Sequence, residues 1–199
     1  EILKGKSKEG IRRGDTITIA DLGTPSRRVH VEVHVSERAT KIQTIKHAQR
    51  VRFHHFSTTI SGKILFFENT NLEKGNKQIA EIRLDRPVFT FAGDRFVLRD
   101  WSKQFTIGGG IILDSSPPKR SYRTEKQRNF LLMRASNPNE FTTHLNSLLT
   151  RDHFIKSDTP LSQSSFSKSV IEDTIENNDA VVSGNFIIDK NWWSEINEI

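Results

Sequence analysis

A strict alternation of apolar and polar residues marks positions 29–35, where the sequence reads VHVEVHV. Successive side chains of a β-strand point to opposite faces, so this segment is predicted to be a strand with one buried valine face. Shorter runs of the same kind predict five more strands, at 50–55, 60–68, 78–84, 95–99 and 105–113. Six short strands with Gly and Pro turns and no helix between them are typical of a closed antiparallel barrel. Residues 69–77 are predicted to be the least ordered loop, and residues 16–20 a separate strand.

A helical pattern replaces the alternation after Pro117-Pro118. The two prolines predict a stiff linker over 116–121, because each proline fixes φ and removes a hydrogen-bond donor. Residues 122–135 and 140–151 are predicted to be helices, and a third helix is predicted to start near Ser164. The apolar residues expected on buried helix faces are Phe141, Leu145, Leu148, Leu149, Phe166, Val170 and Ile175. Gly184-Asn185 separates two apolar runs, which predicts a two-residue hairpin turn. Helices followed by a small hairpin are typical of a winged helix. The predicted fold class is therefore mainly β plus α, a closed antiparallel β-barrel followed by a winged-helix domain.

Composition narrows the class of protein. The 199 residues suffice for one domain plus part of another, or for two small domains. Mean hydropathy is −0.54, and no apolar run approaches the roughly 18 residues that span a bilayer, so we expect a soluble protein without a membrane partner. Cysteine is absent, which excludes disulfides and suits a reducing cytoplasm. Glu1 is not an initiator and no signal peptide is visible, so we expect a monomeric, cytoplasmic fragment of a longer protein.

Charge is distributed unevenly along the chain. Residues 1–120 hold 22 Lys and Arg against 13 Asp and Glu, whereas residues 121–199 hold 8 against 11. A basic first part indicates an anionic partner, most plausibly nucleic acid, although solvated charge would also explain it. The predicted third helix offers Lys168 but also Glu172, Asp173 and Glu176, which is a poor surface for phosphate.

Catalytic and metal sites are not predicted. The sequence contains no Gly-x-x-x-x-Gly-Lys-Ser/Thr loop and no Gly-x-Ser-x-Gly elbow. His54 and His55 point to opposite faces of one strand, so they cannot share an ion. His30 and His34 share a face but lie about 13 Å apart. We therefore expect no enzymatic activity, no metal and no cofactor in this segment.

Two neighbouring motifs carry the most information. Residues 93–100 read GDRFVLRD, and residues 106–110 read TIGGG. Three successive glycines on a sheet edge would leave the backbone open to another backbone or to a phosphate, whereas a barrel corner would need small residues for packing alone.

These motifs resemble the end of the third domain of elongation factor Tu and its relatives, and GDRFVLRD…TIGGGIILD resembles the selenocysteine-specific members (SelB) most. Residues 51–55, VRFHH, followed by SGKI at 61–64, resemble the family's VxxHH…xGxV segment. Residues 10–15, GIRRGD, resemble the step that closes the preceding domain. The three matches occur in the family's order and cover roughly residues 10–114.

The resemblance implies a domain plan. Residues 1–25 would end a preceding barrel, 26–115 would form a domain III-like barrel, 116–121 a linker, 122–190 a winged helix and 191–199 the start of a following helix. It also implies delivery of selenocysteinyl-tRNA to the ribosome at UGA codons, and an mRNA hairpin held by distal winged helices. GTP and Mg²⁺ would belong to the GTPase domain of the parent protein.

The barrel of elongation factor Tu meets the tRNA backbone, which implies a set of contact residues here. Arg50 and Arg52 alternate with Val51 and Phe53, so both guanidiniums are expected on the outer face. The full set of expected tRNA contacts is Arg50, Arg52, His54, Lys63, Lys103, Gln104, Thr106 and Gly108. Relatives usually carry Arg or Lys before the Thr, whereas this chain has Phe105. Arg95 and Arg99 are expected to serve either the fold or an interdomain interface.

Two other functions remain open at this point. One is a different tRNA-carrying translational GTPase, such as an initiation-factor gamma-type protein. The other is a DNA-binding regulator that acts through its winged helix, which the acidic third helix disfavours.

Overall fold

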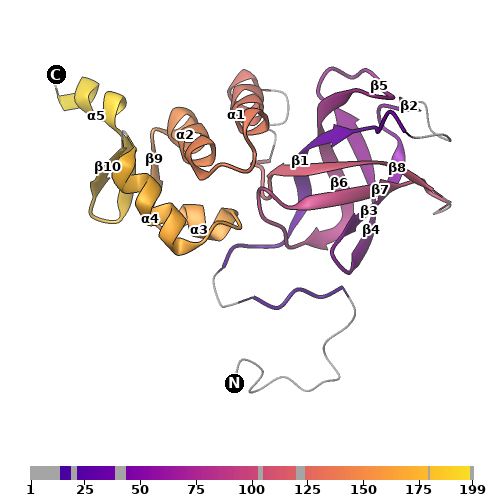
Figure 1. Cartoon of the computed structure of the whole chain (residues 1–199), viewed down its shortest axis with the longest axis horizontal. Coiled ribbons are helices and arrows are strands. Elements are labelled where there is room, and N and C mark those ends of the chain that lie inside the picture. The colour runs from indigo at the N-terminus through magenta and orange to yellow at the C-terminus, as the bar shows by residue number, and fades with distance from the viewer. Residues whose placement is uncertain are drawn as a thin grey trace.

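The computed structural model describes residues 14–18, 22–38, 44–102, 105–119, 124–178 and 180–197 (Figure 1). Six strands close an antiparallel barrel in the order β1-β6-β4-β3-β7-β8, with β8 returning to pair with β1. The strands are β1 (Ser26–His34), β3 (Arg50–His55), β4 (Thr58–Phe66), β6 (Lys77–Val88), β7 (Arg95–Arg99) and β8 (Thr106–Asp114). The six strands predicted by the alternation pattern are therefore confirmed as a closed barrel.

Alternating side chains fill the barrel. The four valines at positions 29, 31, 33 and 35 are fully buried, as the VHVEVHV pattern predicts. They meet inward side chains of the other strands, including Phe53, Ile64, Phe66, Ile82, Leu98, Ile107 and Ile112. The polar residues between them therefore form the outer face of the barrel, which is the face available to a partner or to the helices.

Two short strands lie beside the barrel, β2 (Thr44–Ile45) and β5 (Leu72–Glu73). The Thr44 hydroxyl donates a 2.6 Å hydrogen bond to the Glu73 carboxylate, and the Leu72 side chain is fully buried. The prediction that residues 69–77 form the least ordered loop missed β5, because a two-residue strand has no periodicity to detect. Residues 16–18 form no strand, and residues 19 and 20 lie outside the described ranges.

The three glycines of β8 let neighbouring strands approach closely. A Cβ on Gly110 would lie 1.8 Å from the Glu32 carbonyl oxygen of β1, and one on Gly109 would lie 2.8 Å from the Phe96 carbonyl oxygen of β7. These glycines lie between two paired strands of a closed barrel, so their expected position on a sheet edge is wrong. The backbones of β1 and β7 fill the space beside these glycines. The glycines therefore serve close packing within the barrel, which was the other interpretation of the motif.

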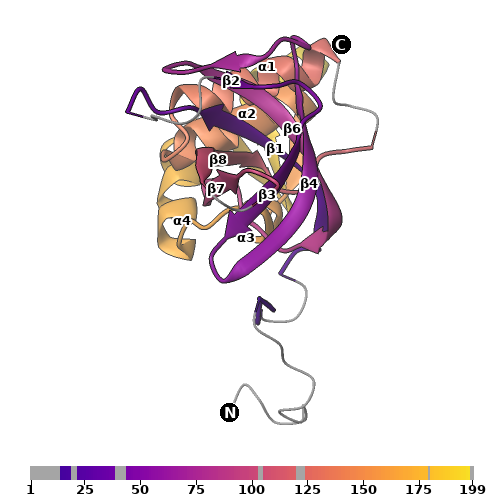
Figure 2. The same ribbon diagram turned by 90° about the vertical axis from the view of Figure 1, so that its right-hand side faces the viewer.

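The second unit contains α1 (Glu125–Ser136), α2 (Phe141–Asp152), β9 (Phe154–Lys156), α3 (Thr159–Gln163), α4 (Lys168–Asn177), β10 (Ala180–Ser183), β11 (Phe186–Asp189) and α5 (Lys190–Asn197). Its sheet has the order β10-β11-β9, so the predicted hairpin gains a third strand. Helices and a small sheet in this order form the predicted winged-helix region. In Figure 2 the barrel lies nearest the viewer, with the helices behind it. Among the described residues, no helix is long and apolar enough to cross a membrane.

The helix predicted from Ser164 begins later, at Lys168. The Ser167 hydroxyl caps it by accepting a hydrogen bond from the Val170 backbone N–H. The prediction that Val170 is buried is wrong, because its side chain is 42% exposed and Ile171 is buried instead. The four apolar residues predicted to be buried on α2 are all buried, because that helix carries a clear apolar stripe.

We predict that Gly110→Ala destabilises the barrel strongly. The added Cβ would overlap the Glu32 carbonyl oxygen, and a backbone atom of a paired strand cannot move aside without breaking the β1–β8 ladder. The free energy of unfolding in urea should fall by about 3 kcal/mol or more, if the variant folds at all.

Gly184→Ala is the matched control, because a Cβ there meets nothing within 4 Å and only its positive φ of 57° opposes the change. Gly184→Ala should lower the free energy of unfolding by about 1 kcal/mol. Equal effects of the two substitutions would contradict the packing role of Gly110.

Candidate nucleic-acid interface

Outward side chains of β3 and β4 bring the predicted basic residues together. Residues directly opposite in an antiparallel pair share a face, and the register places Arg50 opposite Lys63 and Arg52 opposite Ser61. The Arg52 guanidinium donates a 2.6 Å hydrogen bond to the Ser61 hydroxyl. His54 lies opposite Thr59, with Nδ1 3.1 Å from its hydroxyl. Arg50, Arg52, His54 and Lys63 therefore occupy one face of the barrel.

The cationic surface extends over the neighbouring strands. In the strand register, Lys63 lies opposite Arg83 of β6, and Arg83 lies opposite Arg28 of β1. On the other side of β3, Arg52 lies opposite Arg99 of β7 in the strand register. We call this surface the basic face, and its cations are Arg28, Arg50, Arg52, Lys63, Arg83 and Arg99. Sequence reasoning did not assign Arg28 or Arg83 to it, because strand order and register are needed to place them there.

Trp101 is a further residue that sequence reasoning missed. Its ring is half exposed, with the Arg52 Cζ 4.6 Å and the Arg50 Cζ 4.9 Å from the ring centroid. Such cation–π contacts hold guanidiniums in place while leaving their N–H groups able to donate. No local pattern indicated this contact, because Trp101 follows β7 whereas Arg50 and Arg52 lie on β3.

Carboxylates balance part of this charge. Arg50 Nη2 lies 2.8 Å from Asp85 Oδ2, and both side chains are half exposed. Arg83 pairs with Glu81, which is almost fully buried. An exposed pair such as Arg50–Asp85 contributes at most about 1 kcal/mol, so a phosphate can replace its carboxylate at little cost.

Two of the predicted contact residues, Lys103 and Gln104, lie outside the described residues. Thr106 follows them, is exposed and pairs with Arg99 of the basic face. Gly108 pairs with the inward residue Leu98, and a Cβ there would meet the His34 carbonyl oxygen at 2.8 Å, so close strand packing requires this glycine. Phe105, which precedes Thr106, is partly buried and packs against the barrel core.

Arg95 and Arg99 separate in the structure. Arg99 belongs to the basic face, whereas Arg95 is paired with Ile111 of β8 and lines a groove that Pro138 and Asn139 of the α1–α2 loop also line. The nearby Asp94 contacts His55 at 2.9 Å and accepts a hydrogen bond from the Phe91 backbone N–H, so it stabilises a barrel loop.

The winged helix is joined to the barrel by a continuous core. Ile111 and Leu113 of β8 pack in one cluster with Phe130, Leu131, Phe141, Leu145, Leu148 and Leu149 of α1 and α2. A second contact joins the 89–94 loop to the α3–α4 segment, where the Ala92 N–H donates to the Gln163 carbonyl at 3.0 Å. The orientation of the winged helix relative to the basic face is therefore set by packing, in addition to the proline linker.

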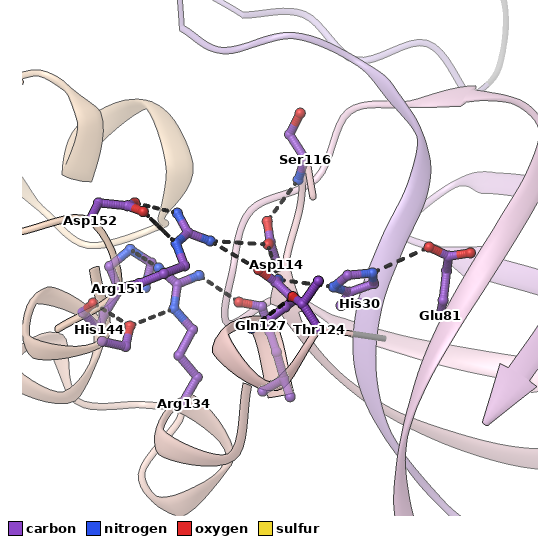
Figure 3. Close-up of polar contacts among 12 residues, drawn as sticks. His30, Glu81, Asp114, Ser116, Thr124, Gln127, Arg134, His144, Arg151 and Asp152 are labelled. Carbon is purple, nitrogen blue, oxygen red and sulfur yellow. Dashed lines mark hydrogen bonds and ion pairs between the residues drawn. The ribbon is translucent and has the colours of Figure 1, made fainter. Parts of the chain in front are cut away.

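Buried polar groups line this junction (Figure 3). Gln127 Nε2 donates to Asp114 Oδ2 at 3.0 Å and lies 3.1 Å from His30 Nδ1, which links α1 to β8 and β1. Arg134 donates to the Leu113 carbonyl at 2.6 Å and to the Ser147 hydroxyl at 2.9 Å. No motif in the sequence marked this network, because its members come from distant segments.

Burial changes the pKa values at the junction. Desolvation lowers the pKa of Arg134 to about 9, so its guanidinium stays charged at neutral pH. Burial, followed by the nearby Arg134 and Arg151 charges, lowers the pKa of His144 well below its ordinary value. Burial opposes ionisation of Glu81, but hydrogen bonds with His30 and Arg83 outweigh it and lower the pKa of that carboxyl.

We predict that His144 makes the protein less stable in mild acid. The unfolded chain binds a proton near pH 6.5 that native His144 does not, so stability is lost as pH falls below 6.5 towards the native pKa. The contribution is at most about 1.4 kcal/mol per pH unit. Denaturant unfolding of wild type and His144→Gln between pH 7 and 5 measures it.

The glutamine keeps an acceptor for Arg134 Nη2, which lies 3.1 Å from His144 Nε2. Native Glu81 stays ionised in this pH window because its pKa is lowered from 4.5. The free energy of unfolding of His144→Gln should therefore fall less steeply with decreasing pH than that of the wild type. Identical pH dependence of the two proteins would contradict the lowered pKa of His144.

Comparison with known proteins supports the barrel assignment. Residues 28–119 match the family model described as the β-barrel domain of selenocysteine-specific elongation factor. The chain is 30% identical over 121 residues to the selenocysteine-specific elongation factor of Haemophilus influenzae, covering 61% of this chain and 19% of that protein. The Escherichia coli factor is 29% identical over 141 residues, covering 69% of this chain and 21% of that protein. The Desulfomicrobium baculatum factor is 36% identical over 70 residues, covering 35% of this chain and 11% of that protein.

The chain thus spans about a fifth or less of the length of these relatives. The segments GDRFVLRD and TIGGG lie within the range 28–119 matched by the family model and contribute to β7 and β8 of the barrel. Residues 28–119, which contain the barrel strands except the start of β1, are therefore similar to the β-barrel domain of the selenocysteine-specific elongation factors.

Proposed function

We propose that this chain is part of a selenocysteine-specific translation elongation factor and that its barrel holds the backbone of selenocysteinyl-tRNA. The observation that carries the proposal is the basic face, where strand register places cations of β3, β4 and β6 beside one another on a barrel that matches this family's domain. Such a factor would work in the cytoplasm and deliver the tRNA to the ribosome at UGA codons. Its GTP and Mg²⁺ would be held by a GTPase domain, and we expect no catalysis from the barrel or the winged helix.

The geometry of the basic face suits a phosphate backbone. Directly opposite residues on neighbouring strands have Cβ atoms about 5 Å apart, so Arg50, Lys63, Arg83 and Arg28 form a cationic row across the barrel. Arginine and lysine contact phosphate oxygens without reading bases. The barrel would therefore supply affinity and orientation, and recognition of the selenocysteinyl group would come from other parts of the factor.

The winged helix would act as a connector towards distal winged helices that hold an mRNA hairpin. Its α4 carries Glu172, Asp173 and Glu176, which oppose contact with phosphate. The same acidic helix argues against a DNA-binding regulator. The match to the selenocysteine-specific family favours the present proposal over an initiation-factor gamma-type protein.

We predict that the chain binds tRNA with an affinity that falls steeply as salt rises, because phosphate contacts release counterions. Lys63→Glu should weaken binding roughly tenfold at low salt and reduce the log–log salt slope by about 1. Fluorescence anisotropy with labelled selenocysteine tRNA over a range of salt concentrations measures both quantities.

Lys126→Glu on α1 is the matched control, because Lys126 is also exposed but lies on the winged helix. It should leave the affinity and the slope unchanged. The assignment of phosphate contacts to the basic face would be contradicted if the wild-type affinity did not change with salt. It would also be contradicted if both variants lost affinity for tRNA equally.

We also predict that Trp101→Ala weakens tRNA binding severalfold without destabilising the barrel. The substitution removes the ring that orients Arg50 and Arg52, and the half-exposed ring contributes little to the core. Binding and thermal unfolding should be measured on the same preparation. Unchanged affinity would show that the two arginines need no support from Trp101.

A further inference from the structure

A groove runs between α4 and the β10–β11 hairpin of the winged helix, and no part of the proposed tRNA contact uses it. It has a volume of about 490 Å³, within the range of ligand sites of roughly 300–1,000 Å³. Its apolar lining consists of Leu161, Ile171, Ile175, Val182 and Ile187. These residues come from α3, α4, β10 and β11, whose positions are seen in Figure 1. We call this feature the wing groove.

The wing groove leaves apolar surface in water. The side chain of Val182 is 59% exposed and that of Leu161 is 38% exposed, while Ile171 and Ile187 at the bottom are buried. Covering such side chains is favourable by about 25 cal/mol per Å² of apolar surface. An exposed apolar groove bordered by polar residues is typical of an interaction site.

The border of the wing groove is acidic. Asp158, Glu172 and Glu176 line it, together with one cation, Lys168. Lys168 Nζ lies 3.5 Å from Glu172 Oε1, and both side chains are largely exposed. The excess of negative charge opposes nucleic acid, although a DNA-reading winged helix would use this helix and hairpin.

We propose that the wing groove binds a basic amphipathic helix of a partner protein. Apolar residues of the partner at i, i+3, i+4 and i+7 would enter between Val182 and Ile175, and its Lys or Arg side chains would meet Glu172 and Glu176. Opposite charge on groove and partner gives orientation and speeds encounter. This partner contact is separate from tRNA binding and uses a different face of the molecule.

A pair of designed peptides tests the proposal with the full chain. One is an 18-residue amphipathic helix with Leu on one face and Lys and Arg on the other, and its counterpart carries Glu at every charged position. Fluorescence anisotropy at physiological salt should show binding of the basic peptide, with the acidic peptide at least tenfold weaker.

Substitutions locate the contact. Glu172→Gln with Glu176→Gln should weaken the basic peptide roughly tenfold, and Val182→Ser should weaken both peptides, since it removes apolar contact. Glu195→Gln, an exposed change on α5, is the matched control and should have no effect. Thermal unfolding confirms that each variant is folded, which the exposure of these side chains leads us to expect.

Three outcomes would overturn the proposal. The first is that the basic peptide does not bind, or binds no better than its acidic counterpart. The second is that Val182→Ser weakens tRNA binding and leaves binding of the basic peptide unchanged, which would place RNA in the groove. The third is concentration-dependent self-association in sedimentation that Val182→Ser abolishes, which would make a second copy of the chain the occupant.

Discussion

The closed barrel depends on the close approach of β8 to β1. There the Glu32 carbonyl oxygen occupies the space that any side chain at position 110 would need. This contact closes the barrel, so every strand has two neighbours. Closure fixes the register of all six strands, and the register decides which side chains lie side by side on the outer surface. The basic face is therefore a consequence of barrel closure, because its cations come from strands distant in sequence.

The same strand carries the connection to the winged helix. Outward residues Ile111 and Leu113 of β8 pack into the helical core, and Asp114 at its end accepts a hydrogen bond from Gln127 of α1. Arg134 is buried here as a charged group, and its desolvation is offset by hydrogen bonds to the Leu113 carbonyl and the Ser147 hydroxyl. A packed junction with satisfied polar groups holds the two units in one orientation. A tRNA-holding barrel would thus transmit its position to the winged helix.

The barrel and the winged helix present surfaces of opposite charge. The barrel presents arginine and lysine to solvent, with Trp101 holding two of the guanidiniums. The winged helix presents an apolar groove bordered by Asp158, Glu172 and Glu176. The first surface attracts phosphate and the second repels it, and each effect is local because salt screens charges beyond about 8 Å at physiological ionic strength. The two proposed contacts, with tRNA and with a basic helix, would therefore lie on separate parts of the molecule.

Much of the fold could be predicted from the sequence, because strand and helix periodicities are local. The VHVEVHV alternation predicted a strand with a buried valine face, the apolar stripe of α2 predicted its buried residues, and Gly184-Asn185 predicted the hairpin. Alternation also placed Arg50 and Arg52 on the outer side of β3. The family resemblance rested on short motifs such as GDRFVLRD, which can be recognised in a sequence because their residues are contiguous.

The tertiary structure alone decided which outward residues become neighbours. Arg83 and Arg28 join the basic face through the β4–β6 and β6–β1 registers, and Gln127 meets His30 across 97 positions of sequence. The glycines of β8 and the late start of α4 at Lys168 likewise depended on packing and capping by other segments. Local sequence determines the direction of a side chain relative to its own strand or helix, whereas contacts between distant segments depend on strand order, register and shared burial, which no local pattern records.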